Sequence, residues 1–106
     1  MFGRQVTLKL KTNSATELNR IATDEILPIL RKQKGFRDET TFVAPERLEA
    51  IANSFWDTKA DAEAYGHTAY SEVLKTLSNV IDGTPTVKNF EFASSTLQQP
   101  AISKLV

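Results

Sequence analysis

The pattern of apolar and polar positions changes its period early in the chain. Segment 4–12, RQVTLKLKT, alternates strictly, with Val6, Leu8 and Leu10 on one face and polar residues on the other. A period of two is typical of a half-buried strand. From residue 13 to residue 36 the apolar positions recur at helical spacing. They are Leu18, Ile21, Ala22, Ile26 and Ile29.

This predicted helix carries signals at both ends and one in its middle. Ser14 and Glu17 match a capping box, in which each side chain bonds a free backbone amide of the first turn. Gly35 supplies the left-handed residue that ends a helix. Pro28 lies within the pattern and cannot donate a backbone hydrogen bond, so it predicts a kink near Asp24.

A hairpin and a second helix are predicted in the middle of the chain. Segments 36–44 and 48–57 have the composition of strands, and the short connection APER between them favours an antiparallel hairpin. Asp57 or Thr58 is then expected to cap a second helix. The apolar face of that helix rotates at Gly66, which predicts a bend or break there. Its later apolar stripe consists of Tyr70, Val73, Leu74, Leu77 and Ile81.

The last part of the chain predicts a helix stop, a fourth strand and an apolar tail. DGTP, residues 82–85, is expected to end the second helix, and segment 86–94 resembles a strand. The tail 97–106 is too apolar for a free end, so we expect it to dock on a partner subunit or a sheet edge. One domain spanning residues 1–106 thus has the order strand, helix, strand, strand, helix, strand. This order predicts an α+β, ferredoxin-like βαββαβ fold, with two helices on one face of a four-stranded antiparallel sheet.

The third predicted strand is apolar on both of its faces. Ile51 and Phe55 point one way, while Ala50, Ala52 and Trp56 point the other way. A sheet that helices cover on one face only should be polar on its other face. We therefore expect a second copy of the chain to cover the second face, which predicts a homodimer.

Composition narrows the classes of function. The 106 residues include thirteen Lys and Arg and thirteen Asp and Glu. A neutral chain without a basic run has no electrostatic reason to bind nucleic acid or an anionic membrane surface. The chain has no cysteine and only one histidine, which excludes thiol catalysis and disfavours a metal site. No run of signal-peptide or membrane-spanning character is present, so a cytoplasmic protein is the expectation.

Three loose motifs accompany this layout. LPILRKQKGF places Gly-Phe after the first helix, SFWDTKADAEAY places a Trp before the cap of the second, and a Gly-x-Pro precedes the fourth strand. In these features the region from Val6 to Phe92 resembles the dimeric α/β-barrel superfamily, and within it the antibiotic biosynthesis monooxygenase (ABM) domain. The resemblance implies a ligand pocket between the helices and the sheet of each subunit.

The resemblance implies two kinds of enzyme. Some ABM-domain proteins oxidise polycyclic phenols with oxygen and without a metal or flavin, whereas another branch cleaves haem. The haem branch uses an Asn, a Trp and a His, and the corresponding positions here hold Val6, Tyr65 and Lys75. The resemblance therefore favours a monooxygenase that needs no cofactor and acts on a small aromatic or polyketide-like molecule. The alternative is a non-catalytic homodimer that binds a small ligand or only stabilises itself.

Two side chains are candidate catalytic bases. Glu25 falls in the apolar stripe of the first helix, where burial would raise the pKa of its carboxyl. In the alternative interpretation, the kink turns Glu25 outward, or Arg37 or Lys88 pairs with it. His67 is the only histidine, and its alternative interpretation is a solvated side chain on the flank of the second helix.

Three further side chains are candidate ligand contacts. Asn53 can donate a hydrogen bond to a substrate oxygen, or it can satisfy a neighbouring backbone group. Trp56 can line the pocket, or it can pack at the end of the sheet. Tyr65 can orient a polar ligand through its hydroxyl, whereas Tyr70 is predicted to be a packing residue.

Overall fold

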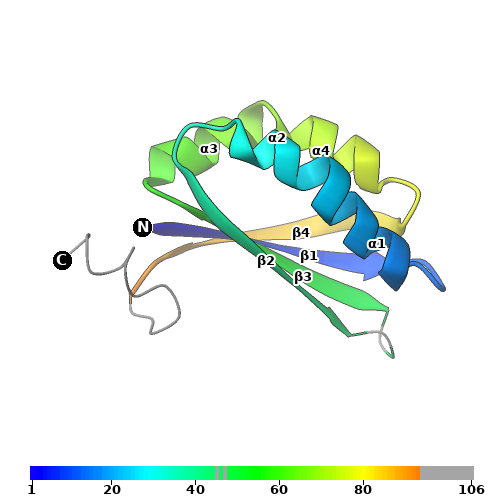
Figure 1. Cartoon of the computed structure of the whole chain (residues 1–106). Helices are drawn as coiled ribbons and strands as arrows, with labels where there is room; N and C mark the ends of the chain where they lie inside the picture. The colour runs from blue at the N-terminus through cyan, green and yellow to red at the C-terminus, as the bar shows by residue number, and fades with distance from the viewer. Residues whose placement is uncertain (45, 47, 94–106) are drawn as a thin grey trace.

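One antiparallel sheet with the helices on one of its faces makes up the described part of the protein (Figure 1). The computed structural model describes residues 1–44, 46 and 48–93, so the predicted tail lies outside the described residues. The elements in chain order are β1 (Phe2–Leu10), α1 (Ala15–Ile21), η1 (Ala22–Ile26), α2 (Leu27–Arg31), β2 (Phe36–Ala44), β3 (Glu49–Trp56), α3 (Lys59–His67), α4 (Tyr70–Leu77) and β4 (Ile81–Glu91). The strands lie in the order β2-β3-β1-β4, and each neighbouring pair is antiparallel. This arrangement confirms the predicted ferredoxin-like fold.

The two predicted helix caps have different outcomes. Thr58 caps α3, since its hydroxyl accepts a hydrogen bond from the backbone N–H of Asp61 at 3.1 Å. The predicted capping box at the start of α1 is wrong, because the Ser14 side chain makes no capping hydrogen bond. Glu17 instead forms an ion pair with Arg20 one turn further along the helix. The charged partner attracts the carboxylate that the box would have used.

The kink that Pro28 predicts takes the form of a π-helical turn, η1, between α1 and α2. The backbone N–H of Leu27 donates to the carbonyl of Ala22, which lies five residues back. Pro28 has no N–H to continue the ladder, and a widened turn before it accommodates the missing bond. Single π-turns of this kind occur frequently at functional sites.

Gly35, at the turn between α2 and β2, should tolerate no side chain. Its φ of +79° is left-handed, and an added Cβ would collide with the Asp61 side chain. We expect Gly35→Ala to lower the free energy of unfolding by more than the ~1–2 kcal/mol that a left-handed alanine costs by itself. Gly83→Ala is the matched control, because Gly83 has a φ of +71° and nothing within 4 Å. Equal losses in urea unfolding would show that the contact with Asp61 has no effect.

The break predicted near Gly66 is confirmed. α3 ends at His67 and α4 begins at Tyr70, so the two helices are separated directly after the glycine. The hydroxyl of Thr68 donates to the carbonyl of Ala64 at 2.7 Å and helps to end α3. The break separates the apolar face of α3 from that of α4, and it lets both faces contact the sheet.

The predicted start of the fourth strand is wrong. Residues 82–85 do not stop a helix, because α4 already ends at Leu77 and these residues belong to β4. The register between β1 and β4 shifts between Thr7 and Lys9, so residues 83–85 lie opposite a single residue of β1. A bulge of this kind tolerates the Gly and Pro that suggested a turn.

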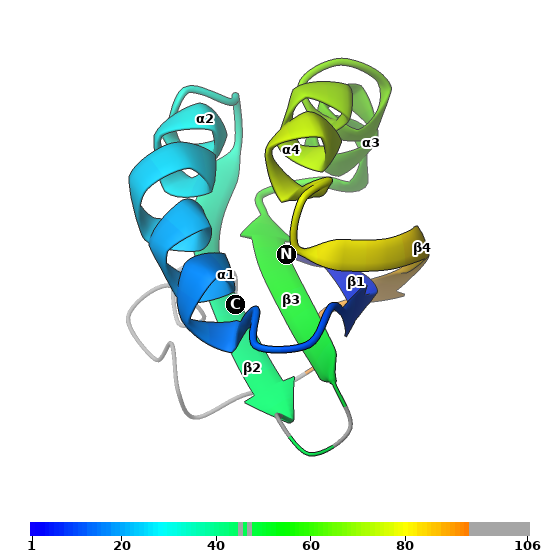
Figure 2. The same cartoon turned by 90° about the vertical axis from the view of Figure 1, so that its right-hand side faces the viewer.

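The core lies between the sheet and the helices, with α1 and α2 over one part of the sheet and α3 and α4 over the other (Figure 2). Of the two faces of β3, the one with Ala50, Ala52 and Trp56 is turned to the helices, and Trp56 is 0% exposed. The buried apolar residues of the helices are Leu18, Ile21, Leu30, Ala62, Tyr65, Val73 and Leu77.

The outer face of the sheet, which the helices do not cover, also carries large apolar side chains. Phe42 on β2 and Phe90 on β4 are 63% and 51% exposed. Ile51 pairs with Phe42 across β2 and β3. The rings of Phe55 and Phe92 meet edge to face with their centroids 5.9 Å apart. The prediction that apolar residues occupy both faces of the third strand is therefore confirmed.

Candidate functional site

Small side chains on the helix-facing side of β3 leave a cavity beneath the helices. Ala52 and Ser54 form part of its floor, and the cavity volume is about 50 Å³. Its apolar walls come from β1, α1, η1, α2 and α4. The polar side chains that line it are Arg4, Glu39, Thr41, Ser54, Tyr65 and Tyr70.

Arg4, Ser54 and Glu39 lie in one row across three neighbouring strands. Arg4 on β1 pairs with Ser54 on β3, which in turn pairs with Glu39 on β2. Strand spacings of about 4.8 Å place the outer two backbones roughly 10 Å apart. Ser54 is short, and this leaves room above it for the two long side chains. Opposite charges therefore face one small apolar cavity from its two sides.

Arg4 is a buried cation that forms no ion pair with a carboxylate among the described residues. It is 8% exposed, and its Nε has no hydrogen-bond partner among the described residues. None of the ion pairs found in that part of the chain includes it. Its guanidinium carbon lies 4.4 Å from the ring centroid of Tyr70 and 5.5 Å from that of Tyr65. Two aromatic faces thus provide the attraction that a buried cation needs.

The two tyrosines form part of a continuous group of aromatic rings. Tyr65 stacks on Trp56 at 5.0 Å and meets Tyr70 edge to face at 5.9 Å. Burial raises the pKa of the Tyr65 and Tyr70 hydroxyls, while the positive charge of Arg4 opposes the shift at both. Both hydroxyls are therefore neutral near pH 7, when they can donate hydrogen bonds but cannot act as bases.

Glu39 is the titratable group of the cavity best suited to accept a proton. Burial raises the pKa of its carboxyl above the ordinary 4.5, and the charge of Asp38 adds to this effect. A hydrogen bond donated by the Thr41 hydroxyl opposes the shift. A carboxyl whose pKa moves toward neutral pH is better matched to proton transfer in that range.

The raised pKa of Glu39 predicts a pH-dependent stability. The contribution of the Glu39 carboxyl to the free energy of unfolding is fully present at pH values below its ordinary pKa of 4.5. This contribution is lost as pH rises through the higher pKa of the folded state. Glu39→Gln cannot titrate, so the free energy of unfolding of the variant minus that of the wild type should increase with pH above 4.5 and then level off. Urea unfolding at a series of pH values measures this difference. A constant or decreasing difference would contradict the burial of the carboxyl.

Among the predicted ligand contacts, Tyr65 lines the cavity and Trp56 does not. Trp56 is enclosed between the rings of Tyr65 and Phe36, and its indole N–H donates to the Ser54 hydroxyl oxygen at 2.9 Å. Of its two interpretations, packing at the end of the sheet is the one that the structure supports. Its role at the cavity is to hold Tyr65 and Ser54 in place.

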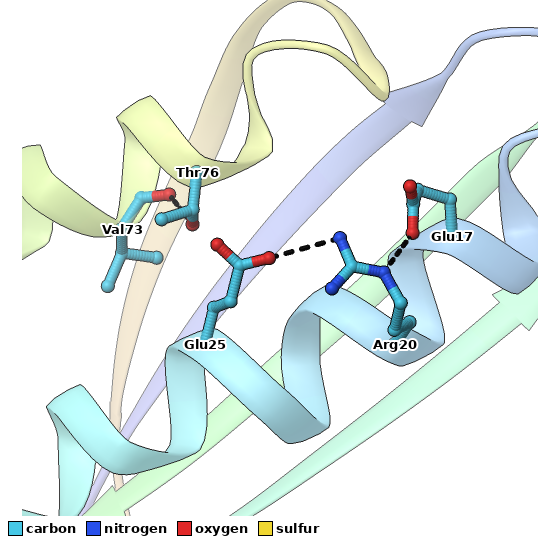
Figure 3. A network of polar contacts seen from close by, with 5 residues as sticks. All are labelled: Glu17, Arg20, Glu25, Val73 and Thr76. Carbon is cyan, nitrogen blue, oxygen red and sulfur yellow. Dashed lines mark hydrogen bonds and ion pairs between the residues drawn. The ribbon is translucent and has the colours of Figure 1, made fainter.

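Glu25 does not lie in the apolar stripe of the first helix, where the sequence pattern predicts it. The expectation that it enters an apolar pocket is wrong, because its side chain is 42% exposed and pairs with Arg20 at 3.1 Å. Figure 3 shows its carboxylate turned along the helix toward Arg20, which also pairs with Glu17. The π-turn turns Glu25 outward, as the alternative interpretation held, although Arg20 takes the place of Arg37 or Lys88.

The other two predicted residues also lie away from the cavity. His67 is exposed at the last position of α3. Asn53 lies on the outer face of the sheet, where its side-chain oxygen accepts a hydrogen bond from Gln5 at 3.2 Å. The structure therefore brings only Tyr65, of the five predicted site residues, into the cavity.

Sequence reasoning missed Arg4, Glu39 and Tyr70 as site residues. The signal for Arg4 was present, because it continues the alternation of Val6, Leu8 and Leu10 on the buried face. A charged residue in phase with an apolar face is a candidate functional group. Glu39 had a weaker signal, since a bulge between Phe36 and Asp38 changes which residues of β2 face the helices.

Comparisons with known proteins identify the fold. No family model and no curated protein matches the chain. The monooxygenase ActVA-Orf6 of Streptomyces coelicolor, solved with nanaomycin D, has a TM-score of 0.75 and 19% identity, over 91% of this chain and 90% of that one. A proposed antibiotic biosynthesis monooxygenase from Nitrosomonas europaea has a TM-score of 0.70 and 16% identity, over 89% and 100% of the two chains. A protein of unknown function from the same organism has a TM-score of 0.72 and 13% identity, over 91% and 92%.

The chain therefore has the ferredoxin-like fold of the ABM-domain proteins, which confirms the resemblance at the level of structure. At these sequence identities the similarity supports the fold alone. Any function has to be argued from the residues that line the cavity. The described residues contain no cluster of three or more His, Cys, Asp or Glu that could hold a metal ion. In the same part of the chain no helix is long and apolar enough to cross a membrane.

Proposed function

We propose that the protein is a cofactor-independent monooxygenase acting on a small aromatic phenol or polyketide-like molecule. The observation that supports this most strongly is the pair of oppositely charged groups, the buried Arg4 and the half-buried Glu39, on either side of an apolar cavity. The monooxygenase ActVA-Orf6, which has the same fold, was solved with nanaomycin D as its ligand. Both findings favour an aromatic ligand with an acidic oxygen.

The chemistry needs only a base and a group that holds an anion. Glu39 accepts the proton of the phenol, and Arg4 holds the phenolate oxygen that results. An electron-rich phenolate can transfer one electron to dioxygen, and recombination of the two radicals forms a carbon–oxygen bond. The unpaired electron is shared with the ring carbons ortho and para to the oxygen, so the new bond forms at one of these carbons. Where that carbon carries one hydrogen, its C–H bond and the O–O bond then break, the hydroxide that leaves takes the proton held by Glu39, and a carbonyl and one water remain. One dioxygen is consumed for each carbonyl and each water that form, so atoms and electrons balance.

The volume of the cavity limits the size of the ligand that can enter it without a movement of the protein. At about 50 Å³ it has room for a few water molecules, so entry of an aromatic ring requires the helices above the sheet to move. The π-turn η1 contributes Ala22 and Ile26 to the cavity wall, and α4 contributes Tyr70 and Val73. The same narrow volume favours the second candidate function, a non-catalytic protein that binds a small ligand.

Oxygen consumption tests which of the two functions holds. Purified protein is screened in an oxygen electrode against phenols and hydroquinones of one to three rings, with and without a chelator. The proposal predicts protein-dependent uptake that the chelator does not inhibit, with one dioxygen consumed per product. Binding of the same phenols without any oxygen uptake would contradict the oxygenase and support the binding protein.

We also propose that the chain forms a homodimer through the outer face of its sheet. The support is an apolar surface on which Phe42 and Phe90 are exposed and Ile51, Phe55 and Phe92 are half-buried. The helix-facing set with Ala50 and Ala52 is already buried within one chain, so only the outer set is available. Apolar surface of this kind typically marks a protein interface.

Phe90→Asp should therefore convert the dimer to a monomer. A carboxylate in the middle of a paired apolar face is buried without a partner, and its desolvation opposes association. Light scattering on the eluting protein measures the mass directly. Ser71→Asp, on the exposed side of α4, is the matched control and should remain a dimer. A wild-type monomer at micromolar concentration would contradict the proposal, as would a Phe90→Asp variant that stays dimeric.

A further inference from the structure

We infer that the cavity selects organic monoanions, and that Arg4 is its anion-binding residue. The ligand class is a planar aromatic molecule with one deprotonated oxygen, a phenolate or a carboxylate, and that oxygen contacts the guanidinium of Arg4. The inference concerns the same cavity as the proposed function and gives the charge of its ligand. It applies equally to an oxygenase and to a binding protein.

The first argument is the unmet hydrogen-bonding capacity of Arg4. A guanidinium remains charged at any accessible pH, so Arg4 cannot avoid the cost of burial by losing its proton. Its Nε is shielded from solvent and has no acceptor among the described residues. A buried donor without a partner costs free energy. An anionic oxygen in the adjacent cavity would accept from this donor and would balance the charge.

The second argument is that the protein itself does not neutralise Arg4 at close range. Glu39 lies two strands away, and the hydroxyl that bonds its carboxyl belongs to Thr41. The rings of Tyr65 and Tyr70 contribute cation–π attraction, and the Tyr70 hydroxyl shares a hydrogen bond with Arg4, but neither tyrosine carries a charge near neutral pH. One unit of positive charge is therefore left facing the cavity for a ligand to balance.

The third argument explains why the ligand carries one negative charge and an aromatic ring. Glu39 on the far side of the row repels a second negative charge when it is ionised, which disfavours phosphates and dicarboxylates. The remaining walls are apolar, and the rings of Tyr65 and Tyr70 present aromatic surface beside Arg4. A flat, apolar body with a single anionic oxygen matches both features.

Gly66 positions the guanidinium. A Cβ at this residue of α3 would lie 3.1 Å from a terminal nitrogen of Arg4, which is tighter than ordinary contact. The absence of a side chain therefore lets the guanidinium lie directly beneath the helix. Gly66→Ala should displace Arg4 without removing its charge, and its effect on ligand binding should be specific to anions.

The test compares two probes of nearly the same shape, 4-nitrophenol and its neutral methyl ether, 4-nitroanisole, in the absence of oxygen. The nitrophenolate absorbs at longer wavelength than the phenol, so a spectrum reports both binding and ionisation. We expect the wild-type protein to bind nitrophenolate in preference to nitroanisole and to lower the pKa of the bound phenol. Arg4→Met should weaken nitrophenolate binding by about tenfold to a hundredfold and leave nitroanisole binding nearly unchanged.

Gly66→Ala and Arg4→Lys keep the inference testable if Arg4→Met does not fold. Gly66→Ala should reduce the preference for nitrophenolate, and Arg4→Lys should retain part of it because the charge remains. Equal affinity of the wild type for both probes would overturn the inference, and so would no nitrophenolate binding at millimolar concentration. The binding test is done without oxygen, so its result does not depend on the oxygen-uptake screen of the proposed function. Selective binding of nitrophenolate together with no uptake in that screen would overturn only the oxygenase. Oxygen uptake in the screen together with no selectivity in the binding test would overturn only the anion site.

Discussion

Trp56→Ala is expected to lower the free energy of unfolding by ~3–5 kcal/mol, the usual cost of removing a large buried aromatic side chain. Trp56 is 0% exposed, stacks on Tyr65 and meets Phe36 edge to face at 5.6 Å. Its indole N–H also donates to Ser54. The substitution therefore removes core volume, two aromatic contacts and one buried hydrogen bond at the same time.

Two controls separate these contributions in urea unfolding. Trp56→Phe keeps an aromatic ring and should lose clearly less stability than Trp56→Ala. Lys75→Ala, at an exposed position of α4, should change the free energy of unfolding by less than about 0.5 kcal/mol. A loss below about 1 kcal/mol for Trp56→Ala would contradict the packing role.

Glu39→Gln is expected to lower the turnover number by about 10²–10⁴-fold, the range typical for removal of a general base. Glutamine keeps the shape of the side chain and can still accept a hydrogen bond from Thr41, but it cannot take a proton from a phenol. The fold should be retained, because glutamine is uncharged and its burial does not carry the desolvation cost of a carboxylate. Steady-state oxygen uptake with the best phenol of the screen measures the effect.

Glu25→Gln is the matched comparison, because it makes the same chemical change on an exposed carboxylate that pairs with Arg20. We expect its turnover number to stay within about twofold of the wild type and its stability within about 0.5 kcal/mol. The reverse result, in which Glu25→Gln loses activity and Glu39→Gln keeps it, would show that Glu25 is the base and that the cavity assignment is wrong.

Much of the fold could be predicted because it depends on local period and on residues with special backbone properties. The alternation of Val6, Leu8 and Leu10 defines β1, and Thr58 and Gly66 mark the start of α3 and its separation from α4. The start of β4 could not be predicted in the same way. Gly83 and Pro85 ordinarily indicate a turn, and here a bulge against β1 carries them inside a strand.

Less of the site could be predicted, because it depends on contacts between distant segments. Tyr65 could be predicted because its hydroxyl is suited to orient a polar ligand. Glu25 was misplaced because a uniform helical period does not allow for the extra residue of the π-turn, which rotates it outward. The row that joins Arg4 and Glu39 depends on pairing across three strands, and the sequence alone gives no register for it.

A crystal structure of the protein with 4-nitrophenolate bound tests the central claim most directly. The account predicts that the ring lies in the cavity between the sheet and the helices, with its anionic oxygen within hydrogen-bonding distance of Arg4 and its apolar edge against Tyr65 and Tyr70. A ligand found instead on the outer face of the sheet near Asn53, or at the end of α3 near His67, with the cavity unchanged, would contradict it.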